Sequence, residues 1–448
     1  MKTVGFVMMV DTSSSMSSVI EQVKIDANAF IGCALPGDYF GINQFSTNAA
    51  WVYPADSDPA ASRVSSDLRE IIDATKKIDL LHSQSMTNIS DAFGLSYKML
   101  DKGIPADIKA FVLISDGEHN TGPKPESVYT GNPPLYIGAL GYWMKESYFK
   151  PLIDKNPKEN KYYHAEKKEE MIKMFYDIRG AVPNALLLAN EQQKYTGVGY
   201  QLVPATVCSA SGKAQFSVAW PDKKYKYTSG RPNGTNINVQ LIDPKGHHRT
   251  DKPAIAGDGY CVFDLNDAQS GEWDVLVQYD ASQPIYGTVG AFQLDVDIKI
   301  EIGAPSVLSA GKPIPLDIEV SRNGTPLENL KIQATVKRPA ISVENALKKY
   351  APRLKNIRLE GNEINPEVPE EIEQLRLLHA QLLPQENILP VYSSFHTLAY
   401  EPAKGMYANT FTETHEAGSY TVQAKITGTD PKTGQPVTWF KNQSFLVG

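Results

Sequence analysis

The first 182 residues alternate between two patterns of apolar positions. Near-continuous apolar runs at 4–10, 111–115 and 135–140, each bounded by Asp or Gly, are typical of parallel strands buried on both faces. More alternating runs at 38–46 and 50–53 predict further strands. Helical periodicity fills the intervals at 19–30, 68–78, 89–100 and 171–178. The alternation of the two patterns predicts a doubly wound α/β domain with a mostly parallel sheet over residues 1–182.

From about residue 183 the pattern changes to short alternating strands separated by turn residues. This spacing predicts antiparallel sandwiches, which we expect to be Ig-like, over residues 183–301 and 302–448. In the later region, the sequence Arg322-Asn323-Gly324-Thr325 predicts a tight hairpin. A Leu/Glu/Lys-rich stretch at about 341–390 predicts a helical insertion in the last sandwich.

Length and composition are those of a globular protein of roughly three domains, at about 150 residues per domain. The 448 residues are 42% apolar and 21% charged. The excess of 51 Asp and Glu over 44 Lys and Arg gives a net charge of −7, which argues against a nucleic-acid-binding surface. No apolar run reaches the roughly 18 residues that a membrane-spanning helix needs.

The N-terminus does not have the pattern of a secretory signal, because its short apolar run ends at the carboxylate of Asp11. We therefore expect a cytoplasmic protein or, if a signal was removed, an extracellular or cell-surface one. The three cysteines leave two alternatives open. Cys208 and Cys261 pair as a disulfide, or all three, with Cys33, are buried thiols.

Five oxygen-bearing side chains follow strand ends or precede helices in the predicted α/β domain. Asp11, Ser13 and Ser15 come directly after the first buried strand, and Asp116 ends another in the sequence Phe-Val-Leu-Ile-Ser-Asp-Gly. Thr87 lies in a loop just before a predicted helix. In a doubly wound sheet ligands bind at the carboxyl ends of the strands, so we expect all five at one edge of the sheet. Each segment alone also fits a helix N-cap or a turn; together they favour a metal site.

An all-oxygen donor set is typical of a hard divalent cation. Mg²⁺, which prefers about six oxygen ligands and retains water, is favoured, with Ca²⁺ and Mn²⁺ as alternatives. Two carboxylates and three hydroxyls leave a coordination position open. The simplest ligand for that position is an Asp or Glu carboxylate of a protein partner.

These residues give the segment 1–182 a resemblance to a von Willebrand factor type A domain with a metal-ion-dependent adhesion site. The D-x-S-x-S motif matches Asp11, Ser13 and Ser15, the distal threonine matches Thr87, and the last aspartate matches Asp116. The resemblance implies a metal that joins a ligand carboxylate, as in the integrin inserted domain. Where the family usually has glycines just before the distal threonine, this chain has Gln84, Ser85 and Met86.

The remainder of the chain more loosely resembles the β-sandwich arrays of calcium-activated chloride channel regulators and bacterial surface proteins. The segments 271–280 and 404–428 carry this similarity. The channel regulators also contain a zinc protease domain. This sequence has no H-E-x-x-H motif, so the resemblance implies no proteolytic activity.

Three functions from different classes fit these features. The leading hypothesis is a non-enzymatic, metal-dependent protein-binding or cell-adhesion module, in which the helix around 166–180 passes a change on binding to the sandwiches. The first alternative is an intracellular scaffold whose metal site engages an ATPase or an assembly factor. The second is a metal-dependent hydrolase, for which Glu118 and His119 are the nearby candidates for a general base. The partner's identity and the oligomeric state stay open.

Overall fold

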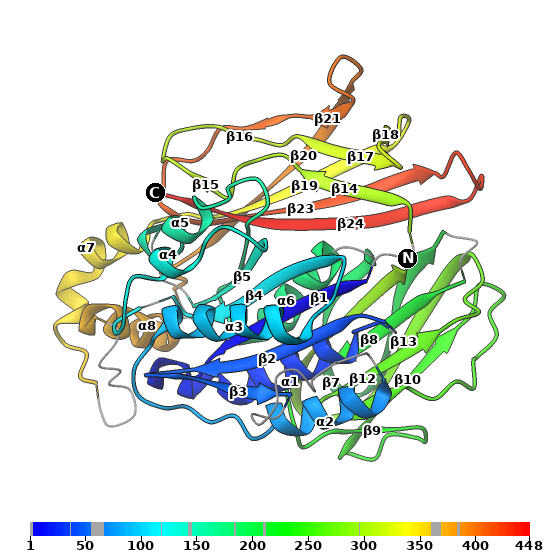
Figure 1. Cartoon of the computed structure of the whole chain (residues 1–448), viewed down its shortest axis with the longest axis horizontal. Helices are drawn as coiled ribbons and strands as arrows, with labels where there is room; N and C mark the ends of the chain where they lie inside the picture. Colours follow the sequence, from blue (N-terminus) through cyan, green and yellow to red (C-terminus); the bar gives the residue numbers. More distant parts are fainter. Residues whose placement is uncertain are drawn as a thin grey trace.

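The computed structural model describes residues 3–35, 37–54, 67–117, 119–141, 146–182, 185–208, 212–294, 296–359, 369–382 and 386–448. In Figure 1 the N-terminal α/β elements (blue to cyan) lie below the C-terminal strands (yellow to red), and a second β region (green) lies at the right. No helix in these ranges is long and apolar enough to cross a lipid bilayer.

The N-terminal elements form a doubly wound sheet of strand order β6-β5-β4-β1-β2-β3, in which only β3 runs antiparallel to its neighbour. The strands are β1 (Val4–Asp11), β2 (Tyr39–Phe45), β3 (Ala49–Tyr53), β4 (Ile108–Ser115), β5 (Leu135–Leu140) and β6 (Lys161–Ala165). The helices are η1 (Ser14–Ser18), α1 (Ile20–Gly32), α2 (Leu68–Ile78), α3 (Ile89–Gly103), α4 (Pro125–Val128), α5 (Glu146–Ile153), η2 (Lys168–Glu170) and α6 (Met171–Ala181).

Alternate residues of β1 face opposite helical layers. Phe6, Met8 and Val10 belong to a buried cluster with residues of α1 and α6, whereas Val7 and Met9 belong to another cluster with residues of α3. A strand buried on both faces needs apolar residues at consecutive positions, which explains the continuous apolar runs. The predicted α/β fold class is therefore confirmed.

The second region is one seven-stranded sheet built around two long strands. β7 and β13 pair antiparallel along almost their whole length, past an irregularity in pairing between Ala281 and Ile285. The strands are β7 (Ala185–Val207), β8 (Ala214–Ala219), β9 (Lys226–Thr228), β10 (Asn236–Ile242), β11 (Ile255–Gly257), β12 (Tyr260–Leu265) and β13 (Gly271–Leu294).

The third region contains the predicted hairpin and the predicted helical insertion. Arg322 pairs with Thr325 across a two-residue turn in which Asn323 and Gly324 both have positive φ. The strands are β14 (Ile298–Ile302), β15 (Val307–Leu308), β16 (Ile314–Pro315), β17 (Ile318–Arg322), β18 (Thr325–Pro326), β19 (Lys331–Pro339), β20 (Val391–Glu401), β21 (Met406–Ala408), β22 (Thr410–Phe411), β23 (Gly418–Thr429) and β24 (Pro436–Val447). The inserted helices are α7 (Val343–Leu354) and α8 (Glu370–Leu382), which share a small apolar cluster.

The three regions are joined by strand pairing and by apolar clusters that each span two regions. β24 pairs with β6 at Ser444 and Tyr162, so the α/β sheet and most of the C-terminal strands form one fifteen-stranded sheet. This pairing covers the edge strand that the α/β sheet would otherwise expose. One apolar cluster contains Trp220 and Trp273 from the second region and Trp439 from the third. The Ig-like character and the limits 182/183 and 301/302 stay predictions.

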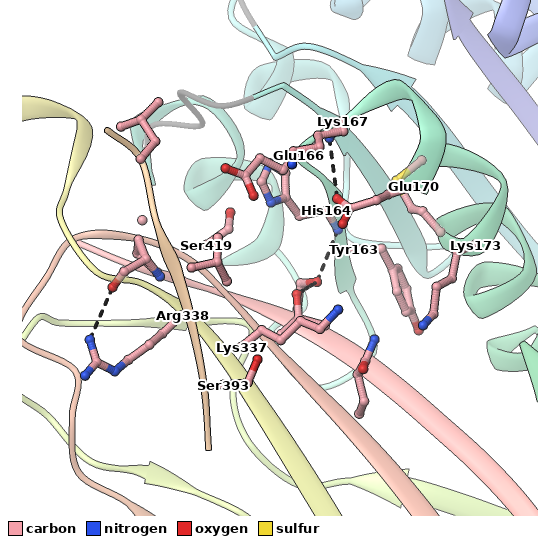
Figure 2. A pocket seen from close by; sticks show the side chains of 18 of the residues that line it. Tyr163, His164, Glu166, Lys167, Glu170, Lys173, Lys337, Arg338, Ser393 and Ser419 are labelled. Atoms are coloured by element: carbon pink, nitrogen blue, oxygen red, sulfur yellow. Dashed lines mark hydrogen bonds between the residues drawn. The ribbon is translucent and has the colours of Figure 1, made fainter. Parts of the chain in front are cut away.

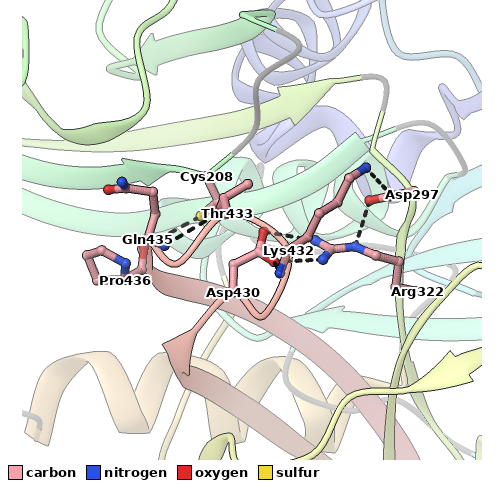
Figure 3. A network of polar contacts seen from close by, with 8 residues as sticks. All are labelled: Cys208, Asp297, Arg322, Asp430, Lys432, Thr433, Gln435 and Pro436. Atoms are coloured by element: carbon pink, nitrogen blue, oxygen red, sulfur yellow. Dashed lines mark hydrogen bonds and ion pairs between the residues drawn. The ribbon is translucent and has the colours of Figure 1, made fainter.

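A polar network ties the turn between β23 and β24 to β17. The Arg322 guanidinium donates two hydrogen bonds to the Asp430 carboxylate, at 2.6 and 2.9 Å, and one to Asp297 at 3.0 Å (Figure 3). Asp430 is 2% exposed, so its charge depends on this arginine.

The sequence left two alternatives open for the three cysteines. The structure has three buried free thiols, and Cys208 and Cys261 are not bonded to each other.

Candidate metal site at the strand ends

Asp11 lies at the carboxyl end of β1, whose neighbours in the sheet are β2 and β4. Here α1, which follows β1, and α3, which precedes β4, lie on opposite faces of the sheet. The Asp11 side chain is fully buried. One carboxylate oxygen accepts a hydrogen bond from the Ser13 amide at 2.9 Å, and the other accepts one from the Ser115 hydroxyl at 2.6 Å. The carboxylate is therefore held from β1 and from β4 together, at the switch point where doubly wound sheets bind ligands.

The segment after Asp11 turns directly into the 3₁₀-helix η1. Ser13 is buried and Ser15 is half-buried, and their hydroxyl oxygens are 2.8 Å apart. The Ser13 side chain makes no capping hydrogen bond, and neither does Val19 at the start of α1. Ser13 is therefore the N-cap residue of η1 by its backbone, but its hydroxyl contacts Ser15 and does not cap the helix.

Thr87 is buried in the loop that lies between the ends of β1 and β4. Its amide donates to the Asn120 side-chain oxygen at 2.9 Å, and its carbonyl accepts the Asn120 amide at 3.1 Å. On the other side, the Ser85 carbonyl accepts hydrogen bonds from the Ser14 amide at 3.1 Å and the Ser14 hydroxyl at 3.0 Å. Hydrogen bonds to neighbouring loops thus hold this segment, although it lacks the family's glycines.

Asp116 is half-buried and follows β4 directly. The next residue, Gly117, has φ +96° and donates its amide to the Ser115 hydroxyl at 3.0 Å. A Cβ at Gly117 would approach the Phe149 ring to 2.9 Å, so glycine is required both for the turn and for this close contact. The turn sets the direction in which the chain leaves β4 after Asp116.

Of the two candidates for a general base, Glu118 lies outside the described residues. His119 accepts a hydrogen bond from the Ile89 amide at 3.3 Å through Nδ1, at the first residue of α3. Burial lowers the pKa of His119, which favours the neutral imidazole that can accept this bond. This contact gives His119 a structural role at the start of α3.

The structure thus places all five predicted site residues at the same edge of the sheet, in three adjacent loops. Their donor atoms are two carboxylates and three hydroxyls, which suit a hard divalent cation. Across the part of the chain that is described, no three His, Cys, Asp or Glu side chains gather as a metal site, so a cation here would depend on the hydroxyl ligands. The sequence alone did not predict the supporting contacts of Ser115 and Asn120. Ser115 is a polar residue directly before the predicted ligand Asp116, and Asn120 is a polar residue in the loop that follows it.

Residues 6–119 match the family model of the von Willebrand factor type A domain. The N-terminal part of the chain is a von Willebrand factor type A domain. The match covers all five predicted site residues. A comparison with curated proteins found no match.

Solved structures similar to this chain include several of low identity. A von Willebrand factor type A protein from Catenulispora acidiphila is 13% identical, with 72% of this chain and 63% of that one covered and a TM-score of 0.36. The manganese-loaded TRAP protein of Plasmodium vivax is 17% identical, with 60% and 95% covered and a TM-score of 0.32. The pilus adhesin SpaC of Lactobacillus rhamnosus GG is 11% identical, with 99% and 56% covered and a TM-score of 0.33. The chain spans less than two thirds of the length of the first and third of these proteins.

Proposed function

We propose that the type A domain binds a divalent cation through Asp11, Ser13, Ser15, Thr87 and Asp116 and uses it to bind a carboxylate of a protein partner. The observation that carries this proposal is the position of the five residues at one sheet edge, with Asp11 held by hydrogen bonds from Ser13 in its own loop and from Ser115 at the end of β4. When bound, the cation would supply an electrophilic position for an Asp or Glu of the partner. Mg²⁺ is favoured, with Mn²⁺ and Ca²⁺ as alternatives.

The charge balance of the site supports the binding of an external anion. Two carboxylates neutralise the two charges of the cation, whereas the three hydroxyls add none. A third carboxylate within this chain would leave less attraction for a partner's carboxylate. The neutral hydroxyl ligands therefore leave the cation able to accept a carboxylate from outside the chain at its open coordination position.

The function we propose is adhesion or protein binding without catalysis. A hydrolase would need a base free to take a proton from a metal-bound water. His119 instead accepts a hydrogen bond from the first residue of α3, which supports the non-catalytic function over the hydrolase. Whether the partner is an adhesion ligand or an intracellular ATPase or assembly factor depends on where the chain is located.

The test is titration calorimetry of Mg²⁺, Mn²⁺ and Ca²⁺ into EDTA-treated protein. We expect one site per chain in the native protein and none in Asp116→Asn or Thr87→Val. Asp73→Asn, which removes an exposed carboxylate of α2, is the charge-matched control and should bind as the native protein does. Equal binding by the native and Asp116→Asn proteins would refute the metal site.

The partner carboxylate is tested separately, on arrays of paired peptides that differ only by Asp against Asn or Glu against Gln. We expect acidic peptides to bind in Mg²⁺, and their amide partners not to bind. Addition of EDTA should abolish the signal. Binding that survives EDTA would remove the cation from the recognition step.

A further inference from the structure

A second site lies away from the strand-end rim, where the type A domain meets the C-terminal strands. A cavity of about 390 Å³ is enclosed by α6 and the end of β6 on one side and by β19, β20, β23 and β24 on the other. Figure 2 shows the side chain of Lys337 rising from the sheet and that of Lys173 extending from α6 toward the same space. The volume is that of a pocket for a small molecule.

The floor of this cavity is a polar row that crosses four strands. The pairing register aligns Ser393 with Lys337, Lys337 with Thr421 and Thr421 with Ser444. Side chains in one such row point to the same face of a sheet, and all four line the cavity. One ammonium group therefore lies among three hydroxyls on this face of the sheet.

The opposite wall presents a second ammonium group. Burial lowers the pKa of Lys173. The positive charge of Lys337 acts in the same direction, whereas the carboxylates of Asp177, Glu170 and Glu191 oppose it. Within the described ranges, neither ammonium group has a carboxylate within 4.0 Å. Two like charges held across a cavity without ion pairs favour an anion between them.

Three acidic residues line the cavity, namely Glu166, Glu170 and Asp177. The Asp177 carboxylate accepts hydrogen bonds from the side-chain amides of Asn190, at 2.6 Å, and Asn442, at 2.7 Å. Burial raises the pKa of Asp177 to about 6 and that of Glu166 to about 7. The charged or titratable groups that face Asp177 are Lys173 on its own helix, Lys441 on β24 and Tyr163 on β6.

We propose that this cavity binds a small polyhydroxylated anion, an acidic sugar or a sugar phosphate, whose anionic oxygens bridge Lys173 and Lys337. The rest of the lining fits such a ligand, because Ser393, Ser419 and Gln423 supply hydroxyl and amide groups for hydroxyls of the ligand. Pro339 and Val391 supply an apolar wall for the less polar face of a sugar ring. A bound anion would connect α6 of the type A domain to the C-terminal sheet.

The test is calorimetric titration of the full chain with glucuronate, glucose 6-phosphate and glucose. EDTA is present throughout, so that binding at the proposed metal site cannot contribute and the two proposals fail independently. At least one of the two anions should bind saturably, and glucose at least about ten-fold more weakly, since one charge-assisted hydrogen bond contributes about that factor. The anion that binds more tightly distinguishes a carboxylate from a phosphate ligand.

Two substitutions localise the binding. Lys337→Gln and Lys173→Gln should each weaken the anion about ten-fold, and Lys337→Arg should retain most of the affinity. Lys348→Gln on α7, where an exposed lysine pairs with Glu344, is the matched control and should change nothing. Circular dichroism checks that each variant folds. The proposal is overturned if neither anion saturates by about 20 mM, a concentration beyond the range of specific pockets, if glucose binds equally well, or if the folded Lys337→Gln protein binds as the native protein does.

Discussion

Ser115→Ala tests whether the carboxylate of Asp11 is positioned from β4. Ser115 is fully buried, donates to Asp11 at 2.6 Å and accepts the Gly117 amide at 3.0 Å. A hydrogen bond to a charged group contributes about 1.5–3 kcal/mol, so we expect the free energy of unfolding to fall by about 2 kcal/mol. Loss of a residue that orients a metal ligand typically weakens metal binding about 10- to 100-fold. We expect the lower end of that range, because the Ser13 amide still holds Asp11.

The assays are calorimetric titration of Mg²⁺ into EDTA-treated protein and urea unfolding of the same samples. Ser96→Ala is the control, because Ser96 is also fully buried, accepts a hydrogen bond from Asn43 at 2.8 Å and lies within α3. It should lose comparable stability and keep the native Mg²⁺ affinity. If Ser115→Ala binds Mg²⁺ as tightly as the native protein, or if both variants lose affinity equally, the argument that β4 positions Asp11 is refuted.

Three further predictions concern parts of the fold outside the site. Arg322→Gln leaves the buried Asp430 carboxylate without its arginine and should lower the free energy of unfolding by about 3 kcal/mol in urea titrations; a loss below about 1 kcal/mol would contradict the role given to this pair. Because burial raises the pKa of Asp177 to about 6, the folded state binds a proton more readily than the unfolded chain, and stability should rise as the pH falls from about 7 toward 4. Asp177→Asn should remove about 2–3 kcal/mol of pH dependence, the free energy that corresponds to this difference in pKa. Parallel stability curves for the two proteins would show the reasoning to be wrong. Gly324→Val places a β-branched residue at φ +79° and should lower the free energy of unfolding by about 1–2 kcal/mol, measured by thermal unfolding. Unchanged stability would contradict the requirement for glycine at this turn.

The local sequence pattern was sufficient to predict most helices and strands of the α/β domain and the positions of the candidate metal ligands. Apolar runs predicted the central strands β1, β4 and β5, and helical periodicity predicted α1, α2, α3 and α6 close to their observed bounds. Once a sheet is parallel and its helices alternate between faces, the loops after its strands meet at one edge. Asp11, Thr87 and Asp116 were therefore predictable from their positions relative to strands and helices, although they are far apart in the chain.

Local periodicity is enough to assign the type of each strongly periodic segment and the sheet edge to which its polar loop residues belong. Three features follow only from the packing of the whole chain: β24 pairs with β6, β7 and β13 run together as long strands, and Ser115 donates to Asp11. The cavity between Lys173 and Lys337 depends on the same long-range arrangement. The physical reason is that periodicity records which face of an element is buried, whereas strand partners and side-chain contacts depend on how distant segments pack against one another.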